Sequence, residues 1–293
     1  MYAPISVHDR MPLRVRRYPG RDIHGQPVQD KPDAIPGDGK CSYLAFAPDN
    51  TAVCTLRAAI MEANATSQAD TVLLQDGATY VLSIEGRGEA GSATGDLNIT
   101  APLTIYAGLF GRATIDANGI DRVIRVQSSD VTLYGLNITG GSLDDGDEMT
   151  CDPSGGINAD YFENLQLTLV RVYGNDAGCD GAVVVGPSAK LRYCEIFSNS
   201  GIGIRAVGGN LEIDASSVHD NGFYDIDVQN GGSLLLTSST VSHMAPSFSY
   251  GIRLRTSSSG TIANSTIVSN QAALSVQQQS RLFMANTLKN RLT

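Results

Sequence analysis

From about residue 97 onward, the sequence repeats itself at intervals of about twenty residues. Each repeat contains an apolar residue that is followed, five positions later, by a β-branched or aliphatic residue. The pairs are Leu133/Ile138, Leu167/Val172, Leu191/Ile196, Ile213/Val218, Leu236/Val241, Ile262/Ile267 and Phe283/Leu288. A fixed period of this length means that each repeat is one structural unit stacked on the next. The sequence therefore predicts a solenoid.

Apolar and polar residues alternate within both halves of each repeat, which is typical of β-strands. The strand that precedes each pair reads VIRVQ, GINAD, AVVVG, GIGIR, DIDVQ, GIRLR or ALSVQ. Leucine-rich repeats have a similar period, but their LxxLxLxxN consensus is absent here. We therefore predict an all-β fold, a right-handed single-stranded parallel β-helix with a short N-terminal capping α-helix.

Strand alternation also assigns side chains to the inside of the coil. The inward column just before the second apolar residue of each pair is predicted to contain Leu136, Val170, Cys194, Ser216, Ser239, Ser265 and Asn286. Most of its later members are small. Cys194 lies in this column, so we expect a buried and unreactive thiol.

The N-terminal region lacks the repeat. Residues 1–40 are rich in Pro, Gly, Arg and Asp, and we predict an extended arm that is partly disordered. Its five arginines between Arg10 and Arg21 form either a basic contact strip or a solvated tail. The β-helix domain is assigned to residues 41–293. It opens with a helix over about 55–65, N-capped by Thr55, and has regular coils over about 97–291.

Charge and hydropathy exclude two classes of partner. The net charge of −9 argues against duplex nucleic acid as the main partner. No apolar run approaches the length of a membrane-spanning helix, so we expect no membrane span.

The five cysteines predict the compartment. Local pairs Cys41–Cys54 and Cys151–Cys179 leave Cys194 over, and no CxxC or Cys/His spacing indicates zinc. Two disulfides and one odd thiol fit a secreted or cell-surface protein. The chain starts without a secretory signal, so either a signal has been removed and Met1 is an added start, or export uses none.

Residues 53–65, VCTLRAAIMEANA, together with the upstream GDGKC, resemble the CSLREA-type motif. That motif opens many bacterial surface and secreted β-helix proteins of the pectin-lyase-like superfamily. Thr55 stands for the usual serine and Ala58 for the usual glutamate. The resemblance implies a helix that caps the first coil, and it implies little about chemistry because one fold hosts many functions.

The strands that precede the apolar pairs present two outward columns, in which a candidate binding site lies. The first contains Arg125, Asn158, Val184, Gly203, Asp227, Arg253 and Ser275. The second contains Gln127, Asp160, Gly186, Arg205, Gln229, Arg255 and Gln277. Neighbouring coils are about 4.8 Å apart, so Arg205, Asp227, Arg253 and Arg255 are expected to form one patch.

The patch predicts a ligand class. Guanidinium groups bind carboxylates bidentately, and tyrosines such as Tyr224 and Tyr250 stack on sugar rings, so an acidic polysaccharide or cell-surface glycan suits it. Asp160 is included among the binding candidates. The alternative is a salt-bridged solenoid surface with little net binding. On the remaining outward surface, the pairs Arg171/Glu195 and Arg192/Asp214 are interpreted as structural ion pairs.

The insertion at 142–156 carries clustered carboxylates, at Asp144, Asp145, Asp147, Glu148 and Asp152. Ca²⁺ takes about six to eight oxygen ligands, so this loop is the candidate calcium site. It lacks the full EF-hand spacing, and a merely solvated acidic loop is the alternative. No other cofactor is expected.

No motif identifies an enzyme. The polygalacturonase pattern is absent, and the weak catalytic candidates are Arg205, Asp227, Arg253 and Tyr224. We predict a secreted or surface β-helix that binds or presents a surface to carbohydrate. A polysaccharide lyase, or less readily a glycoside hydrolase, is the alternative.

The last coil, RLFMANTLKN, is followed by three residues only, which are too few for a cap. Its strands would present unpaired backbone groups. We therefore expect this coil to pack against more chain, a partner or another copy, unless the N-terminal arm covers it.

Overall fold

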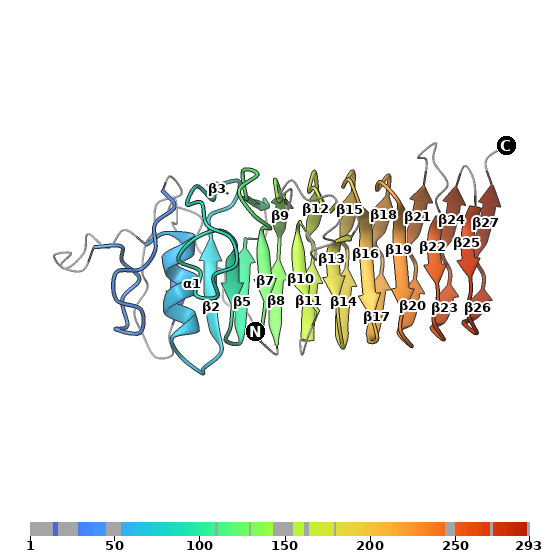
Figure 1. Ribbon diagram of the computed structural model, residues 1–293, viewed down its shortest axis with the longest axis horizontal. Helices are drawn as coiled ribbons and strands as arrows, with labels where there is room; N and C mark the ends of the chain where they lie inside the picture. Colours follow the sequence, from blue (N-terminus) through green and yellow to red (C-terminus); the bar gives the residue numbers. More distant parts are fainter. Residues whose placement is uncertain are drawn as a thin grey trace, which may run out of the picture.

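The computed structural model shows an elongated stack of coils, each built from three short strands (Figure 1). It describes residues 14–16, 29–44, 54–108, 111–128, 130–142, 155–160, 164–178, 180–243, 250–269 and 272–291. Strands in equivalent positions pair in parallel from coil to coil and form three long sheets. The predicted parallel β-helix is confirmed.

The three sheets are named here by their number of described strands. The ten-stranded sheet runs β1 (Arg14–Arg16), β2 (Asp70–Leu74), β5 (Leu103–Ala107), β8 (Val131–Tyr134), β11 (Asn164–Thr168), β14 (Ser188–Arg192), β17 (Asn210–Asp214), β20 (Ser233–Thr237), β23 (Ser259–Ala263) and β26 (Arg281–Ala285). The nine-stranded sheet runs β3 (Thr79–Val81), β6 (Ala113–Asp116), β9 (Leu136–Thr139), β12 (Arg171–Tyr173), β15 (Glu195–Phe197), β18 (Ser217–His219), β21 (Thr240–His243), β24 (Thr266–Ser269) and β27 (Leu288–Arg291). The eight-stranded sheet runs β4 (Leu97–Ile99), β7 (Ile124–Val126), β10 (Ile157–Ala159), β13 (Gly181–Val185), β16 (Ile202–Val207), β19 (Tyr224–Gln229), β22 (Tyr250–Leu254) and β25 (Ala272–Val276). Coils therefore begin at β2, earlier than residue 97.

The corner between the ten-stranded and nine-stranded sheets is very tight. In most coils the strand of the first sheet is followed by a non-glycine residue with positive φ, such as Leu169, Tyr193 or Ala215. This left-handed conformation is costly for residues with a Cβ. Its backbone N–H donates to the next coil, for example from Leu169 to the carbonyl of Arg192 at 3.0 Å. Stacking therefore stabilises the corner that makes each coil.

The interior follows the predicted apolar columns. All members of the first six apolar pairs are fully buried. Cys194 is free and 3% exposed, as predicted. Burial raises the pKa of its thiol to about 11, so the thiolate is disfavoured at neutral pH.

The small inward residues form a hydrogen-bonded ladder. Ser216 accepts from the backbone N–H of Cys194 at 3.0 Å, and Ser239 accepts from that of Ser216 at 3.1 Å. Ser265 accepts from Ser239 in the same way at 3.2 Å. Each hydroxyl also donates to the carbonyl two residues earlier in its own coil. These serines satisfy backbone groups that the corner would otherwise leave buried and unpaired.

A second ladder, of asparagines, lies at the turn between the nine-stranded and eight-stranded sheets. Asn175 donates its side-chain amide to Asn199 Oδ1 at 3.0 Å, and Asn199 donates to Asn221 Oδ1 at 2.9 Å. Asn221 in turn donates to Asp225 Oδ1 at 2.9 Å. This ladder was not predicted from the sequence, although each asparagine follows the second apolar residue of its repeat by three positions.

The last coil corrects the predicted alignment. Met284, and not Phe283, lies level with Ile262, and Lys289, and not Leu288, lies level with Ile267. Phe283 and Leu288 are 65% and 62% exposed. Gly260 explains the shift, because Leu254 and Leu282 occupy the space that a Cβ at this position would fill. The member of the serine column is accordingly Thr287, which donates to Ala285 O, and not Asn286.

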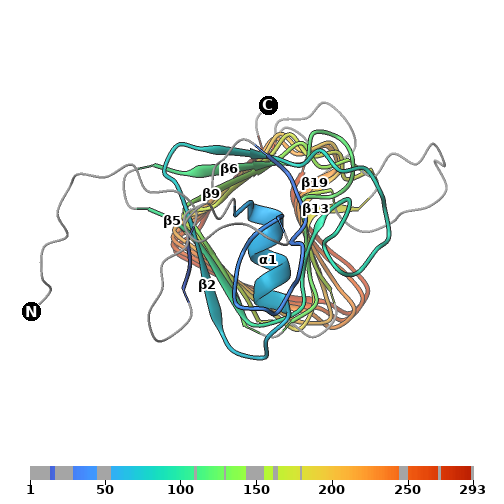
Figure 2. The same cartoon turned by 90° about the vertical axis from the view of Figure 1, so that its left-hand side faces the viewer.

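The predicted capping helix is α1 (Leu56–Asn64), which lies over the N-terminal end of the stack (Figure 2). The Thr55 side chain accepts from Ala58 N at 3.0 Å, which confirms the N-cap. Two charged residues on this helix are buried, a feature that the helical pattern did not predict. Arg57 is 0% exposed and Glu62 is 1% exposed.

Arg57 and Glu62 hold the surrounding segments on the helix. Arg57 forms a two-point ion pair with Asp30, with Nε–Oδ1 at 2.7 Å and Nη2–Oδ2 at 3.0 Å. It also donates to the carbonyls of Ser92 and Gly95 at 2.9 and 2.8 Å. Glu62 accepts from the backbone N–H groups of residues 37 and 39. Part of the N-terminal segment therefore packs on the cap, and the proposed boundary between residues 40 and 41 stays a prediction.

The cysteine predictions are confirmed where the structure describes them. Cys41 and Cys54 form a disulfide with a Cα–Cα distance of 5.0 Å. The predicted pair Cys151–Cys179 lies outside the described residues. Within the described part of the chain, no helix is long and apolar enough to cross a membrane.

Replacement of Asn199 by alanine tests the asparagine ladder. Asn199 is 3% exposed, and its amide donates to the carbonyls of Val172 and Phe197, both at 3.1 Å. Asn199→Ala removes these hydrogen bonds together with the side-chain bonds to Asn175 and Asn221, so we expect the free energy of unfolding to fall by about 1–3 kcal/mol. Urea unfolding measures the change. Asn210→Ala, at an exposed position, is the control, and its expected change is below about 0.5 kcal/mol. Equal destabilisation by the two substitutions would contradict the role of the ladder.

Candidate functional site

The candidate site lies on the outer face of the eight-stranded sheet. Here Arg205 on β16 is level with Asp227 on β19, and Asp227 is level with Arg253 on β22. The first outward column thus contains Arg205, and the predicted Gly203 is wrong. Strand alternation has a period of two, so a shift of β16 by two residues preserves the pattern and is invisible in the sequence.

Asp227 is the centre of an arginine cluster. It is 0% exposed and receives a two-point interaction from Arg253, with Nε–Oδ1 and Nη2–Oδ2 both at 2.8 Å. Arg255 Nη2 lies 3.2 Å from Oδ2, and Arg205 Nε lies 3.7 Å from it. Three guanidinium groups therefore converge on one buried carboxylate. The four residues form one patch as expected, and the ion pairs within it are those that the salt-bridged alternative requires.

This arrangement stabilises the charged form of Asp227. Burial opposes ionisation, but hydrogen bonds and attraction from Arg253 and Arg255 outweigh it and lower the pKa of the carboxyl. Conversely, burial would lower the pKa of Arg253, but the bond to Asp227 raises it. Neither group is suited to proton transfer near neutral pH, which weakens both as catalytic candidates.

Asp180 is a neighbour of the cluster that the sequence analysis missed. Its Oδ1 lies 2.7 Å from Arg205 Nη1. Burial raises its pKa although Arg205 favours the charged form, and Asp160 and Asp227 add repulsion. Burial also raises the pKa of Asp160, opposed by Arg125 and Arg122. Asp180 directly precedes β13 and belongs to none of the predicted columns. Its proximity to Arg205 could be predicted only from the register between the two coils.

Tyr224 and Tyr250, the first residues of β19 and β22, lie beside the cluster. The rings of Tyr224 and Tyr250 stack with centroids 6.0 Å apart, and Arg253 Cζ lies 3.9 Å from the Tyr224 centroid. Both tyrosines are partly buried. Because these contacts use ring faces, less aromatic surface remains for a sugar than the sequence suggested. The stack instead holds Arg253 in place.

Arg255 is the most exposed of the three arginines in the cluster. Its side chain is 30% exposed, compared with 16% for Arg253 and 15% for Arg205. It contacts Asp227 through Nη2, and its buried Nε has no hydrogen-bond partner in the described structure. The exposed part of a guanidinium at the edge of a rigid cluster is suited to bind an incoming carboxylate.

Further polar residues continue this face toward the N-terminal end. Arg122 Nε lies 2.7 Å from Asp96 Oδ2, and Asn98 Nδ2 donates to Asp96 Oδ1 at 2.9 Å. Burial raises the pKa of Asp96 to about 6, and repulsion from Asp121 adds to this effect while Arg122 opposes it. Asn98 is level with Arg125 on β7 and Arg125 with Asn158 on β10. The polar face therefore spans most of the eight-stranded sheet.

Two further side chains with potential acid–base chemistry, those of Asp225 on β19 and His219 on β18, make structural contacts. Asp225 is 0% exposed and accepts from the side chain of Asn221 at the turn. His219 belongs to β18, where Asp220 and Glu195 contact its two ring nitrogens at 2.9 and 3.4 Å. No group of three or more potential metal ligands occurs among the described residues.

The calcium candidates Asp144, Asp145, Asp147, Glu148 and Asp152 lie outside the described residues. The metal site therefore stays a prediction.

The two predicted structural ion pairs differ in outcome. Arg171 and Glu195 lie on the nine-stranded sheet and form an ion pair at 2.7 Å. Arg192 and Asp214 lie on the ten-stranded sheet and are level with each other, but no ion pair joins them in the described structure. Asp214 instead accepts from Thr237 Oγ1 at 2.7 Å.

Comparisons with known proteins agree with this architecture. A family model described as a right-handed β-helix region matches residues 155–292, which are 138 of the 293 residues. The chain thus resembles right-handed β-helix proteins in sequence as well as in fold. The resemblance of residues 53–65 to the CSLREA-type motif lies outside this match and stays a prediction.

Three solved structures align with this chain. Pectate lyase Pel9A aligns with 14% identity and a TM-score of 0.45, over 72% of this chain and 69% of its own. The A-module of the mannuronan C-5 epimerase AlgE4 from Azotobacter vinelandii aligns with 15% identity and a TM-score of 0.49, over 86% and 74%. The AlgE6 A-module from the same organism aligns with 12% identity and a TM-score of 0.34, over 82% and 97%. No curated protein matches the sequence.

Replacement of Arg253 tests the role of Asp227 as the centre of the cluster. Arg253→Gln leaves a buried carboxylate with weaker partners, so we expect the free energy of unfolding at pH 7 to fall by about 3 kcal/mol. Arg171→Gln breaks a pair whose side chains are 44% and 30% exposed and should cost less than about 1 kcal/mol. Denaturant unfolding of both variants measures this difference.

The pH dependence follows from the direction of the shift. A carboxyl whose folded pKa is lowered contributes stability above its unfolded pKa and loses it as the pH falls through the folded pKa. The difference between wild type and Arg253→Gln should therefore shrink below about pH 4. A difference that is constant from pH 7 to pH 3 would contradict the assignment.

Proposed function

We propose that this protein binds an acidic polysaccharide along the outer face of the eight-stranded sheet. The observation that supports this most is the cluster of Arg205, Arg253 and Arg255 around Asp227. Three guanidinium charges face Asp227 and Asp180, which leaves one positive charge unbalanced at the exposed edge, on Arg255. The cluster is held by ion pairs and stacking, so little side-chain freedom is lost when a ligand binds.

The proposal assigns different roles to the arginines. Arg255 contacts the ligand carboxylate, whereas Arg253 and Asp227 hold the Arg255 side chain in position. Asp160 and Tyr250 border the binding face. A row of polar groups at the coil spacing suits an extended polymer of repeating charge rather than a compact ligand.

The proposed location is secreted or at the cell surface. The Cys41–Cys54 disulfide supports an oxidising compartment, since disulfides rarely persist in a reducing cytosol. The proposed partner is therefore an extracellular or cell-surface glycan. Calcium held by the carboxylates of the loop at 142–156 remains part of this proposal.

Calorimetric titration with polyuronate oligosaccharides tests the proposal. Arg255→Gln should weaken binding about tenfold or more, because a charge-assisted hydrogen bond contributes about 1.5–3 kcal/mol. Raising the salt concentration should weaken wild-type binding further. Arg171→Gln, on the nine-stranded sheet, is the matched control and should bind like wild type. Equal affinity of wild type and Arg255→Gln would remove this face from consideration.

A lyase acting on the same polymer is the second candidate. The observation that favours it is Asp180, a carboxyl with raised pKa beside Arg205, since a lyase needs a proton acceptor near groups that neutralise a uronate. If this is correct, incubation with polyuronates releases unsaturated products that absorb ultraviolet light, and Asp180→Asn abolishes the release. Polymer that stays intact after long incubation with the wild-type protein would exclude the lyase and leave binding as the only proposed function.

A further inference from the structure

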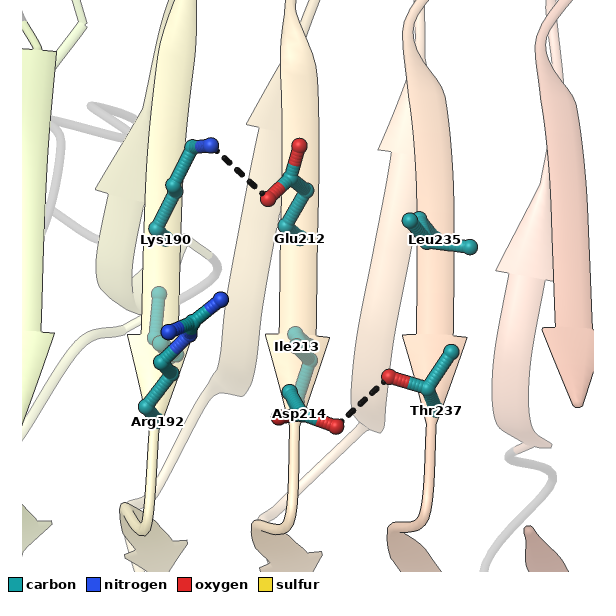
Figure 3. A pocket seen from close by; sticks show the side chains of 8 residues that line it. Lys190, Arg192, Glu212, Ile213, Asp214, Leu235 and Thr237 are labelled. Carbon is teal, nitrogen blue, oxygen red and sulfur yellow. Dashed lines mark hydrogen bonds and ion pairs between the residues drawn. The ribbon is translucent and has the colours of Figure 1, made fainter. Parts of the chain in front are cut away.

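A pocket lies on a different surface, the outer face of the ten-stranded sheet (Figure 3). It is formed by neighbouring strands β14, β17 and β20, whose outward side chains are Lys190, Arg192, Glu212, Asp214, Leu235 and Thr237. None of the candidate residues of the eight-stranded sheet contributes to it. The pocket is therefore separate from the proposed polysaccharide face.

Three of the four charged side chains of this pocket have a partner within it, and the fourth, Arg192, has none in the described structure. Lys190 Nζ lies 3.1 Å from Glu212 Oε2, with both side chains close to half exposed at 49% and 41%. Asp214 accepts from Thr237. Arg192 lies level with Asp214, yet in the described structure its guanidinium has neither an ion pair nor a side-chain hydrogen bond. Its fork of donors is available to a ligand.

The balance of charge restricts the ligand. Two cations, Lys190 and Arg192, face two carboxylates, Glu212 and Asp214, so the pocket as a whole is neutral. Any anion on Arg192 is also repelled by Asp214 and Glu212, and this repulsion grows with the charge of the ligand. A carboxylate carries a single charge and matches the planar guanidinium with two parallel hydrogen bonds, so it suits Arg192 better than a dianion such as phosphate.

The remaining groups match a sugar ring. Carboxylates and the Thr237 hydroxyl accept hydrogen bonds from ligand hydroxyl groups. Leu235 is 40% exposed and offers an apolar contact to the C–H groups of a ring. Acceptors for hydroxyls, a free guanidinium and one apolar side chain are thus within one shallow pocket.

We propose that this pocket binds a monocarboxylate sugar unit through Arg192, as a second site independent of Arg255. The same outward row continues from Arg192 through Thr168 to Tyr134 and Tyr106. The two tyrosine rings stack with centroids 4.8 Å apart. A longer acidic glycan held at Arg192 has a further polar contact at Thr168, and it reaches the parts of Tyr134 and Tyr106 that their mutual stacking leaves exposed. Two binding faces on one rod would allow the protein to hold two glycan chains.

Amide chemical shifts of the ¹⁵N-labelled full chain test the proposal, with sodium glucuronate, glucose, acetate and inorganic phosphate as probes. Glucuronate should shift amides of β14, β17 and β20 and bind more tightly than the other three. Arg192→Gln should weaken glucuronate binding at these amides at least tenfold. Arg281→Gln, an exposed arginine on β26 of the same sheet, is the matched control and should leave it unchanged.

Three results would overturn the proposal. Acetate or phosphate binding as tightly as glucuronate would make this a general anion site, and unchanged binding by Arg192→Gln would exclude the guanidinium. Shifts confined to β16, β19 and β22 would assign glucuronate to the other face alone. Arg255→Gln separates the two proposals, because it should leave the shifts at β14, β17 and β20 intact whether or not the polysaccharide face binds.

Discussion

The in-register stacking of coils is the constraint on which the rest of this structure depends. From β2 to β27 each strand pairs in parallel with its equivalent in the next coil, and only β1 pairs antiparallel, with β2, among the described strands. Side chains at level positions in the coils therefore lie about 4.8 Å apart. Inside, a polar group must therefore bind the group above or below it, as Asn199 does with Asn175 and Asn221. Outside, neighbouring charges must alternate in sign, as Arg205, Asp227 and Arg253 do. Both ladders and the candidate site follow from the same register.

Much of the architecture could be predicted because it is encoded locally. The repeat period, the helix with its Thr55 N-cap and the burial of Cys194 depend on alternation within a few neighbouring residues. Register depends on contacts between coils, and there the predictions were wrong at Gly203 and at Phe283. At Gly203 the predicted register of β16 is wrong by two residues, which leaves the inward and outward alternation unchanged. At Phe283 the predicted register of β26 is wrong by one residue, and the contact between Leu282 and Gly260 shows the correct one.

The candidate site could be predicted in its members but not in their roles. Arg205, Asp227, Arg253 and Arg255 come together as expected, yet burial and pairing make Asp227 a structural centre and leave Arg255 as the available cation. Asp180 was missed because it belongs to no repeated column. Arg57 was missed because its partners, Asp30 and the carbonyls of Ser92 and Gly95, are distant in sequence and their convergence leaves no periodic signal.

A crystal structure of the protein in complex with a uronate oligosaccharide tests the central claim most directly. The account predicts an extended ligand on the outer face of the eight-stranded sheet, with a carboxylate about 3 Å from the Arg255 guanidinium. Arg253 should remain on Asp227 in that complex. A ligand bound elsewhere with Arg255 facing solvent, or a ligand that displaces Arg253 from Asp227, would contradict the claim that the stacked coils present a preformed binding cluster.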